Sequence, residues 1–270
     1  MIPSLTLLSG LTLDQTSSSD TSLPVCPEAL EQAVGLVAEG RLNHIAIIMD
    51  GNRRWAKAHN KPGFQGHVQG YGALRELVRF CQDRLHLPVL TVYAFSTENW
   101  NRTPPEVTFL TQLLKTAIHD EFSQLIQNNI QVRFIGDLSA FPPAIETACH
   151  KLNEQSLLNT GMRFQIALNY GGRAEIVAAC RRLMGQVEAG QLRADAFDEA
   201  MLTAAMYTAE VPDPDMIIRT GGESRLSNFL LWQSAYAEIM VRQELWPDFT
   251  PGVLLDTIST FAGRQRRYGV

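Results

Sequence analysis

Short runs of consecutive apolar residues alternate along the chain with longer stretches in which apolar positions recur every three or four residues. The short runs predict six β-strands, at residues 44–49, 88–95, 130–135, 164–168, 216–218 and 239–241. The longer stretches predict helices at residues 70–85, 106–127, 143–158, 174–188, 195–207 and 252–264. Because this alternation is typical of parallel sheets covered on both faces, we predict an α/β fold with a six-stranded, mostly parallel central sheet flanked by helices.

The first 25 residues differ from the rest of the chain. Residues 1–25 are rich in Ser, Thr and Asp and show little periodicity, so we expect a mobile N-terminal tail and regular structure from about Pro27. Residues 26–270 contain no internal repeat and no linker, which indicates a single domain. No apolar run approaches the roughly 20 residues that span a bilayer, and no basic segment of a signal or transit peptide precedes Arg41. We therefore expect a cytoplasmic protein.

Composition and charge narrow the function classes. Hydrophobic residues make up 45% of the chain and charged residues 19%, which excludes a disordered or collagen-like protein. The formal net charge of -5 excludes a global basic surface for nucleic acid, so any anionic ligand must be bound locally. The four cysteines show no paired spacing, which fits neither a zinc knuckle nor a disulfide framework and indicates a reducing compartment.

Polar residues follow the first predicted strand, and in parallel sheets ligands bind at the carboxyl ends of the strands. Asp50 is followed by Gly51, which lets the backbone turn, and then by Arg53 and Arg54. A carboxylate beside two guanidinium groups suits a magnesium-bound phosphate ester. The same residues equally fit an Asp50 that caps a helix beside solvated arginines.

Two further strand ends carry donors and acceptors. Residues 96–102 follow the second strand and predict either a binding loop or a plain connection capped by Ser96 or Thr97. After the fifth strand, Arg219 is followed by Gly221 and Gly222, a pair that can form a backbone nest for an anion. Three such strand ends on an acidic protein predict an anion site at this edge of the sheet.

Two intervening segments leave alternatives open. Residues 56–70 are rich in small and polar residues and predict a flexible loop able to close over a ligand, with His67 as a phosphate donor, an acid or base, or a helix-start residue. The apolar stripe in residues 106–127 predicts ordinary core, and alternatively the wall of an apolar channel.

Four blocks of the sequence resemble the cis-prenyltransferases, in particular the bacterial undecaprenyl diphosphate synthases: residues 44–56, 93–102, 169–173 and 218–233. The resemblance runs in order from about Arg41 to the C-terminus. It implies a homodimeric α/β catalytic domain with an apolar tunnel, here residues 26–270. The implied reaction condenses isopentenyl diphosphate repeatedly onto an allylic diphosphate, typically farnesyl diphosphate, with Mg²⁺ as cofactor. The implied product is a Z-polyprenyl diphosphate, undecaprenyl diphosphate for a cell-wall lipid carrier, with transient membrane contact for its release.

The resemblance also implies roles for individual residues. Asp50 and Asn99 match the catalytic positions, and Asp50 and Glu238 match magnesium ligands. Substrate contacts are implied for Gly51, Asn52, Arg53, Arg54, Trp55, His67, Ser96, Thr97, Glu98, Trp100, Arg102, Arg219, Arg225, Leu226 and Ser227. Because a neutral amide is a very weak base, we expect Asn99 to orient a water or a diphosphate oxygen that accepts the proton.

The chain departs from the family pattern at three positions: Arg53 replaces a common Gly, Gly63 a common Arg, and Ser224 a common His.

We expect the tunnel wall to contain Ala94, Leu110, Leu114, Ile130, Ile135 and Met162. Alternatives are a shorter or longer product, a metal-dependent phosphohydrolase with Asp50 as nucleophile, and a non-catalytic partner subunit. The last would be expected to lack Asp50 or Arg219, and both are present.

Overall fold

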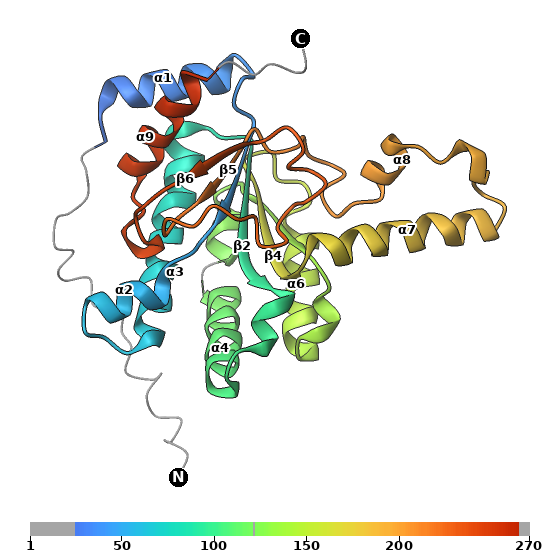
Figure 1. Ribbon diagram of the computed structural model, residues 1–270, viewed down its shortest axis with the longest axis horizontal. Coiled ribbons are helices and arrows are strands. Elements are labelled where there is room, and N and C mark those ends of the chain that lie inside the picture. The colour runs from blue at the N-terminus through green and yellow to red at the C-terminus, as the bar shows by residue number, and fades with distance from the viewer. Residues whose placement is uncertain (1–24, 121, 265–270) are drawn as a thin grey trace.

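The computed structural model describes residues 25–120 and 122–264, so the expected tail lies, apart from Val25, outside the described residues. Its centre is a single sheet (Figure 1). The strands are β1 (His44–Ile48), β2 (Val89–Ser96), β3 (Gln131–Ile135), β4 (Arg163–Tyr170), β5 (Met216–Arg219) and β6 (Glu238–Val241). They lie in the order β3-β4-β2-β1-β5-β6, and all neighbouring pairs are parallel. The predicted fold class is confirmed.

The central strands β1 and β5 are buried along their whole length because both faces of the sheet are covered there. In β1, Ile45 and Ile47 join the larger core cluster, whereas Ala46 and Ile48 join a smaller cluster on the opposite face. The larger cluster receives residues from α1 (Pro27–Ala38), α3 (Gly63–Phe80), α4 (Pro104–Asp120), α5 (Phe122–Gln127), α6 (Pro143–Gln155) and α9 (Pro251–Ala262). The smaller cluster contains Phe229 and Leu230 of the segment that follows β5.

Two helices project from the body of the molecule. Figure 1 shows α7 (Gly172–Glu188) extending away from the sheet, with α8 (Glu199–Ala204) beside it. They share a small apolar core of their own, which includes Leu183 and Leu202. The helix predicted at 195–207 is shorter in the structure, where it is α8, and a 3₁₀ turn at Ala194–Ala196 precedes it.

The prediction of a flexible loop at residues 56–70 is wrong. The short helix α2 (Asn52–Ala58) enters this segment, and α3 begins at Gly63. The small residues indicate close packing here, because a Cβ at Gly66 would lie 1.9 Å from the main-chain oxygen of Asn52. A side chain at that position would push α2 and α3 apart.

The remaining differences concern helix boundaries. The single helix predicted at 106–127 is two helices, α4 and α5, and α1 was not predicted as a helix. No helix among the described residues is long and apolar enough to cross a membrane.

Candidate active site

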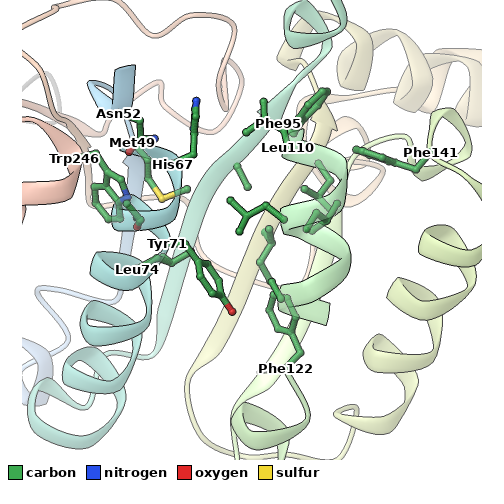
Figure 2. A pocket seen from close by; sticks show the side chains of 17 residues that line it. Met49, Asn52, His67, Tyr71, Leu74, Phe95, Leu110, Phe122, Phe141 and Trp246 are labelled. Carbon is green, nitrogen blue, oxygen red and sulfur yellow. Dashed lines mark hydrogen bonds between the residues drawn. The ribbon is translucent and has the colours of Figure 1, made fainter. Parts of the chain in front are cut away.

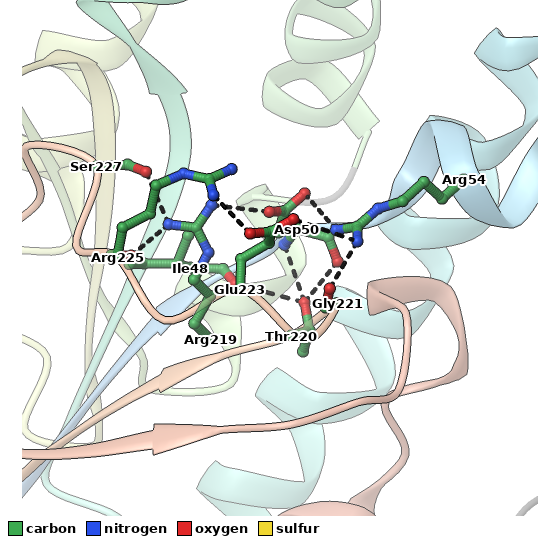
Figure 3. Close-up of polar contacts among 9 residues, drawn as sticks. All are labelled: Ile48, Asp50, Arg54, Arg219, Thr220, Gly221, Glu223, Arg225 and Ser227. Carbon is green, nitrogen blue, oxygen red and sulfur yellow. Dashed lines mark hydrogen bonds and ion pairs between the residues drawn. The ribbon is translucent and has the colours of Figure 1, made fainter.

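Asp50 lies two residues after the end of β1. Its side chain is next to Arg219, the last residue of β5. Because β1 and β5 are neighbours in the sheet, their carboxyl ends bring the two side chains together. Arg219 Nη2 donates to Asp50 Oδ2 at 2.8 Å, and Arg219 Nη1 donates to Ser227 Oγ at 2.7 Å (Figure 3). The Arg219 side chain is only 5% exposed, so its charge acts in a largely desolvated site.

Arg54 approaches Asp50 from the first turn of α2. Its Nη2 lies 3.1 Å from Asp50 Oδ1, and its Nη1 donates to the main-chain oxygen of Gly221 at 2.6 Å (Figure 3). Burial alone would raise the pKa of Asp50, but the hydrogen bond and charge of Arg219, together with Arg54, lower its pKa overall. Asp50 is therefore an ionised carboxylate held between two cations.

The expected anion nest at Gly221 and Gly222 is not formed. The Gly221 amide donates to the main-chain oxygen of Glu244 at 2.7 Å, and the Gly222 amide donates to that of Arg242 at 2.8 Å. Both N–H groups are thus used by the chain that follows β6, and the pair instead presents the Gly221 oxygen to Arg54.

The end of β2 continues into a 3₁₀ turn, Thr97–Asn101, closed by a capping box. The Ser96 amide donates to Asn99 Oδ1 at 3.1 Å. Asn228 Nδ2 donates to Glu98 Oε1 at 3.2 Å, which connects this turn with the segment after β5. Trp100 Nε1 donates to Asn169 Oδ1 at 2.8 Å.

Three basic side chains converge on Glu106, in the first turn of α4. Arg102 Nη1 donates to Glu106 Oε1 at 2.8 Å, and Arg53 and His67 approach the same carboxylate at 3.7 and 3.8 Å. Burial, reinforced by the charges of Arg102 and Arg53, lowers the pKa of His67 to about 4 despite Glu106. His67 is therefore neutral near pH 7, and its buried Nε2 has no hydrogen-bond partner.

These strand ends surround a polar cavity of about 600 Å³. Of the predicted site residues, the structure brings the following to its wall: Asp50, Asn52, His67, Ser96, Glu98, Asn99, Arg102, Arg219, Arg225 and Ser227. A side pocket of about 110 Å³ adds Gly51, Arg53 and Arg54. The prediction of an anion site at this edge of the sheet thus corresponds to one connected group of polar side chains.

An apolar cavity of about 130 Å³ lies next to the polar one, between α3, α4 and β2 (Figure 2). Tyr71 and Leu74 line it from α3, and Leu110 and Phe122 from the facing helices. Five residues line both cavities: Met49, Asn52, His67, Ala94 and Leu110. Ala94, Leu110 and Leu114 line the apolar cavity as expected, whereas Ile130, Ile135 and Met162 are core residues that do not.

Several predicted contacts lie elsewhere. Trp55 donates from Nε1 to Asp248 Oδ1 at 2.7 Å and stacks on His59, and it lines neither cavity. Thr97, Trp100 and Leu226 also lie outside both linings. Trp100 instead packs on Phe95 and Phe141, which line the apolar cavity.

Glu238 does not join Asp50. It begins β6 and is paired with Met216, the first residue of β5, whereas Asp50 lies beyond the opposite ends of the strands. Its Oε2 accepts a hydrogen bond from Arg264 Nη1 at 2.5 Å. Within the chain, the two predicted magnesium ligands Asp50 and Glu238 therefore lie at opposite ends of the sheet, and the described residues contain no cluster of three or more acidic, His or Cys ligands.

The three departures from the family pattern are placed differently. Arg53 lies at the side pocket and faces Glu106. Gly63 begins α3, and a Cβ built at this position would meet no neighbouring atom within 4 Å. As a glycine, it has no side chain that could take the place of the arginine common in the family. Ser224 is exposed in the turn after β5.

Sequence reasoning missed several residues of the site, among them Met49, Tyr93, Glu106, Asn228 and Trp246. The spacing of Arg102 and Glu106, four residues apart on a helix start, is a signal that could have identified Glu106. Trp246 lies far along the chain and donates from Nε1 to the main-chain oxygen of Gly70 at 2.8 Å, a contact that no local pattern indicates.

Known proteins resemble this chain over most of its length. Residues 48–269 match the family model described as "Putative undecaprenyl diphosphate synthase". The isoprenyl transferase of Bacillus anthracis is 44% identical over 84% of this chain and 87% of its own. The ditrans,polycis-undecaprenyl-diphosphate synthase ((2E,6E)-farnesyl-diphosphate specific) of Aliivibrio fischeri is 42% identical over 84% and 88%.

The chain is also similar to solved structures of prenyl diphosphate synthases. The lavandulyl diphosphate synthase of Lavandula x intermedia, in complex with dimethylallyl diphosphate, is 37% identical with a TM-score of 0.81 and covers 84% of this chain and 98% of its own. A "probable undecaprenyl diphosphate synthase" of Campylobacter jejuni is 31% identical with a TM-score of 0.70, over 85% and 99%. With the family model matching most of the chain and relatives above 40% identity, this chain belongs to the undecaprenyl diphosphate synthase family and is a cis-prenyltransferase.

Proposed function

We propose that this enzyme condenses isopentenyl diphosphate repeatedly onto an allylic diphosphate, with farnesyl diphosphate as the starter, to make a Z-polyprenyl diphosphate of undecaprenyl length. The observation that carries the proposal is the shared rim of the two cavities, at Met49, Asn52, His67, Ala94 and Leu110. A diphosphate needs the cations of the polar cavity, and a hydrocarbon chain needs an apolar space next to it. Each CH₂ group buried there favours binding by about 0.8 kcal/mol.

The allylic diphosphate is assigned to the Asp50 side of the polar cavity. Arg54 and the side pocket around Arg53 and Arg102 offer guanidinium groups to a diphosphate. Isopentenyl diphosphate is assigned to the side formed by Arg219, Arg225 and Ser227. Holding the two anions at neighbouring strand ends brings their hydrocarbon ends together, which lowers the entropic part of the barrier.

The oxygen atoms near Asp50 fit Mg²⁺. The Asp50 carboxylate lines the polar cavity, and the neighbouring Asn52 Oδ1 is buried without a hydrogen-bond partner. Mg²⁺ commonly binds through one or two carboxylates together with substrate phosphates, so Asp50 is the residue that would hold it. Bound there, the ion supplies positive charge for the negative charge that builds on the departing diphosphate.

Asn99 is assigned an orienting role in the final proton loss. Its Oδ1 accepts the amide hydrogen of Ser96, so its remaining polar group is the Nδ2 donor. A donor suits an oxygen of water or of diphosphate, and that oxygen then accepts the proton. This arrangement supports the expectation that Asn99 is not itself the base.

A homodimer remains part of the proposal. The edge strand β6 exposes Ile239 and Val241, at 43% and 37%, and α7 exposes Val177 and Met184. Exposed apolar side chains on an edge strand and on a projecting helix favour a protein interface. Sedimentation equilibrium tests it: the expected mass is twice 30.1 kDa, and a monomer at all concentrations would contradict it.

The proposed reaction is tested by incubating the protein with farnesyl diphosphate, radiolabelled isopentenyl diphosphate and Mg²⁺ and sizing the extracted products. Long Z-polyprenyl products are expected. A short product would favour the alternative of a synthase for shorter chains. The small apolar cavity and the similarity to lavandulyl diphosphate synthase are the observations in its favour. Phosphate release from a single substrate, without condensation, would favour the phosphohydrolase alternative and overturn the proposal.

A further inference from the structure

Asn228 lies where three polar segments of the site meet, and neither the resemblance nor the comparisons assign it a role. It directly follows Ser227 and lines the polar cavity. Both residues have left-handed backbone conformations, with φ values of 65° for Asn228 and 49° for Ser227. Such conformations cost free energy in residues other than glycine, so surrounding contacts must hold them.

The contacts that hold Asn228 come from two separate segments. From the start of α7, the Gly172 amide donates to the Asn228 main-chain oxygen at 2.7 Å, and the Arg173 amide donates to Asn228 Oδ1 at 2.9 Å. In the other direction, Asn228 Nδ2 donates to Glu98 Oε1 at 3.2 Å. The carboxamide thus accepts on one side and donates on the other, which neither a carboxylate nor an apolar side chain can do.

The joint is tightly packed. A Cβ at Gly171 would lie 2.7 Å from Asn228 Nδ2 and 2.9 Å from Thr97 Oγ1. The backbone between β4 and α7 therefore passes in direct contact with both the Asn228 side chain and the Thr97–Asn101 turn. A shift of any one of the three segments displaces the other two.

Asn228 is next in sequence to the hydroxyl that we assign to isopentenyl diphosphate. Ser227 Oγ accepts from Arg219 Nη1 at 2.7 Å, which fixes the segment from the β5 side. Asn228 fixes it from the side of Glu98, whose carboxylate also lines the cavity. We propose that Asn228 is a positioning residue whose side chain holds Ser227 and Glu98, on two different loops, at the separation that isopentenyl diphosphate requires. This inference rests on the proposed function.

The test is the variant Asn228→Asp, which keeps the shape and the acceptor for the Arg173 amide but places a carboxylate against Glu98. We expect KM for isopentenyl diphosphate to rise about tenfold, the effect of losing one hydrogen bond to a charged group. KM for the allylic substrate should change by less than about twofold if its site is separate. Asn228→Gly retains access to the left-handed backbone without the side chain, and should raise the same KM.

Two comparisons separate positioning from general stability. Asn129→Asp is a matched control, because Asn129 also has a positive φ, of 63°, and its carboxamide accepts from the Thr160 amide and donates to Thr160 Oγ1, away from the site. It should leave both KM values unchanged. In the second comparison, Glu98→Gln is added to Asn228→Asp. The amide at position 98 can then donate to the carboxylate at position 228, which restores the hydrogen bond with donor and acceptor exchanged. The double variant should bind isopentenyl diphosphate more tightly than Asn228→Asp alone.

Calorimetric titration with isopentenyl diphosphate, measured beside the kinetics, keeps this inference separable from the proposed function. A wild-type protein that binds isopentenyl diphosphate but does not extend an allylic diphosphate contradicts the proposed function alone. Unchanged affinity in Asn228→Asp overturns the inference. The inference is also overturned if Asn228→Asp loses affinity for both substrates equally, has a lowered unfolding temperature, and shows no recovery of affinity in the double variant.

Discussion

Arg219 donates one hydrogen bond to Asp50, at 2.8 Å, and another to Ser227, at 2.7 Å. One buried guanidinium therefore connects the carboxylate that follows β1 with the hydroxyl that follows β5. Because the planar guanidinium presents donors in fixed directions, the two groups are held at a set separation. In the proposed reaction these groups belong to the sites of different substrates, so Arg219 sets the distance between those sites.

Arg219→Gln should move the pH dependence of the reaction. Without the cation of Arg219, only Arg54 opposes the effect of burial, so the pKa of Asp50 rises and a higher pH is needed to keep the carboxylate ionised. The acid limb of kcat/KM should then appear at higher pH than in the wild type, with Mg²⁺ kept saturating. The control Arg225→Gln removes a cation whose side chain is 62% exposed and should leave the acid limb in place. An acid limb identical in all three proteins would contradict the account of Asp50.

Replacing Ala94 by Leu should shorten the product. Ala94 lines both cavities, so a larger side chain there narrows the passage from the polar to the apolar space. Products are measured by reversed-phase chromatography after dephosphorylation. Ala73→Leu adds the same atoms to α3 at a position that lines neither cavity, and should give wild-type products. Unchanged product length in Ala94→Leu would remove Ala94 from the path of the chain.

Stability should fall as the pH is lowered from 6.5 to 4. The pKa values of His44 and His67 are both lowered to about 4 by burial, so within this window the unfolded chain binds protons that the folded protein does not. Each residue contributes a loss of about 3 kcal/mol in the free energy of unfolding across the window. His67→Gln should remove about half of the part of this slope that the two histidines contribute, measured by urea unfolding at several pH values. Curves that run parallel for wild type and variant would mean that His67 is not buried in its neutral form.

Asn99→Asp should lower turnover. A carboxylate still accepts the Ser96 amide hydrogen, but it cannot donate to an oxygen of water or diphosphate as the Asn99 Nδ2 does. We expect kcat to fall at least tenfold, the effect of about 1.4 kcal/mol in the barrier, with little change in either KM. If turnover rose instead and acquired a new acid limb, Asn99 would occupy the position of a direct base.

The sequence predicted the sheet and the location of the site because both depend on local patterns. Continuous apolar runs such as that in β1 mark strands buried on both faces, and polar residues directly after them lie at one edge of the sheet. Asp50, Asn99 and Arg219 line one cavity for this reason, although 169 residues separate the first from the last.

What the sequence did not predict depends on contacts between distant segments. Glycines in residues 56–70 indicated flexibility, but Gly66 is a packing contact against Asn52. The Gly221 and Gly222 amides pair with the chain after β6, which no spacing reveals. Glu238 has the residue type of a magnesium ligand, yet its position at the amino end of β6 separates it from Asp50.

The most direct test of the account is a crystal structure with Mg²⁺ and farnesyl thiodiphosphate, a slowly reacting analogue of the allylic substrate. We predict the diphosphate beside Asp50 and Arg54, and the farnesyl chain passing Ala94 into the apolar cavity between Leu110 and Tyr71. A farnesyl chain that lies outside this cavity, while the diphosphate binds as predicted, would contradict the claim that the shared rim is the path of the growing product.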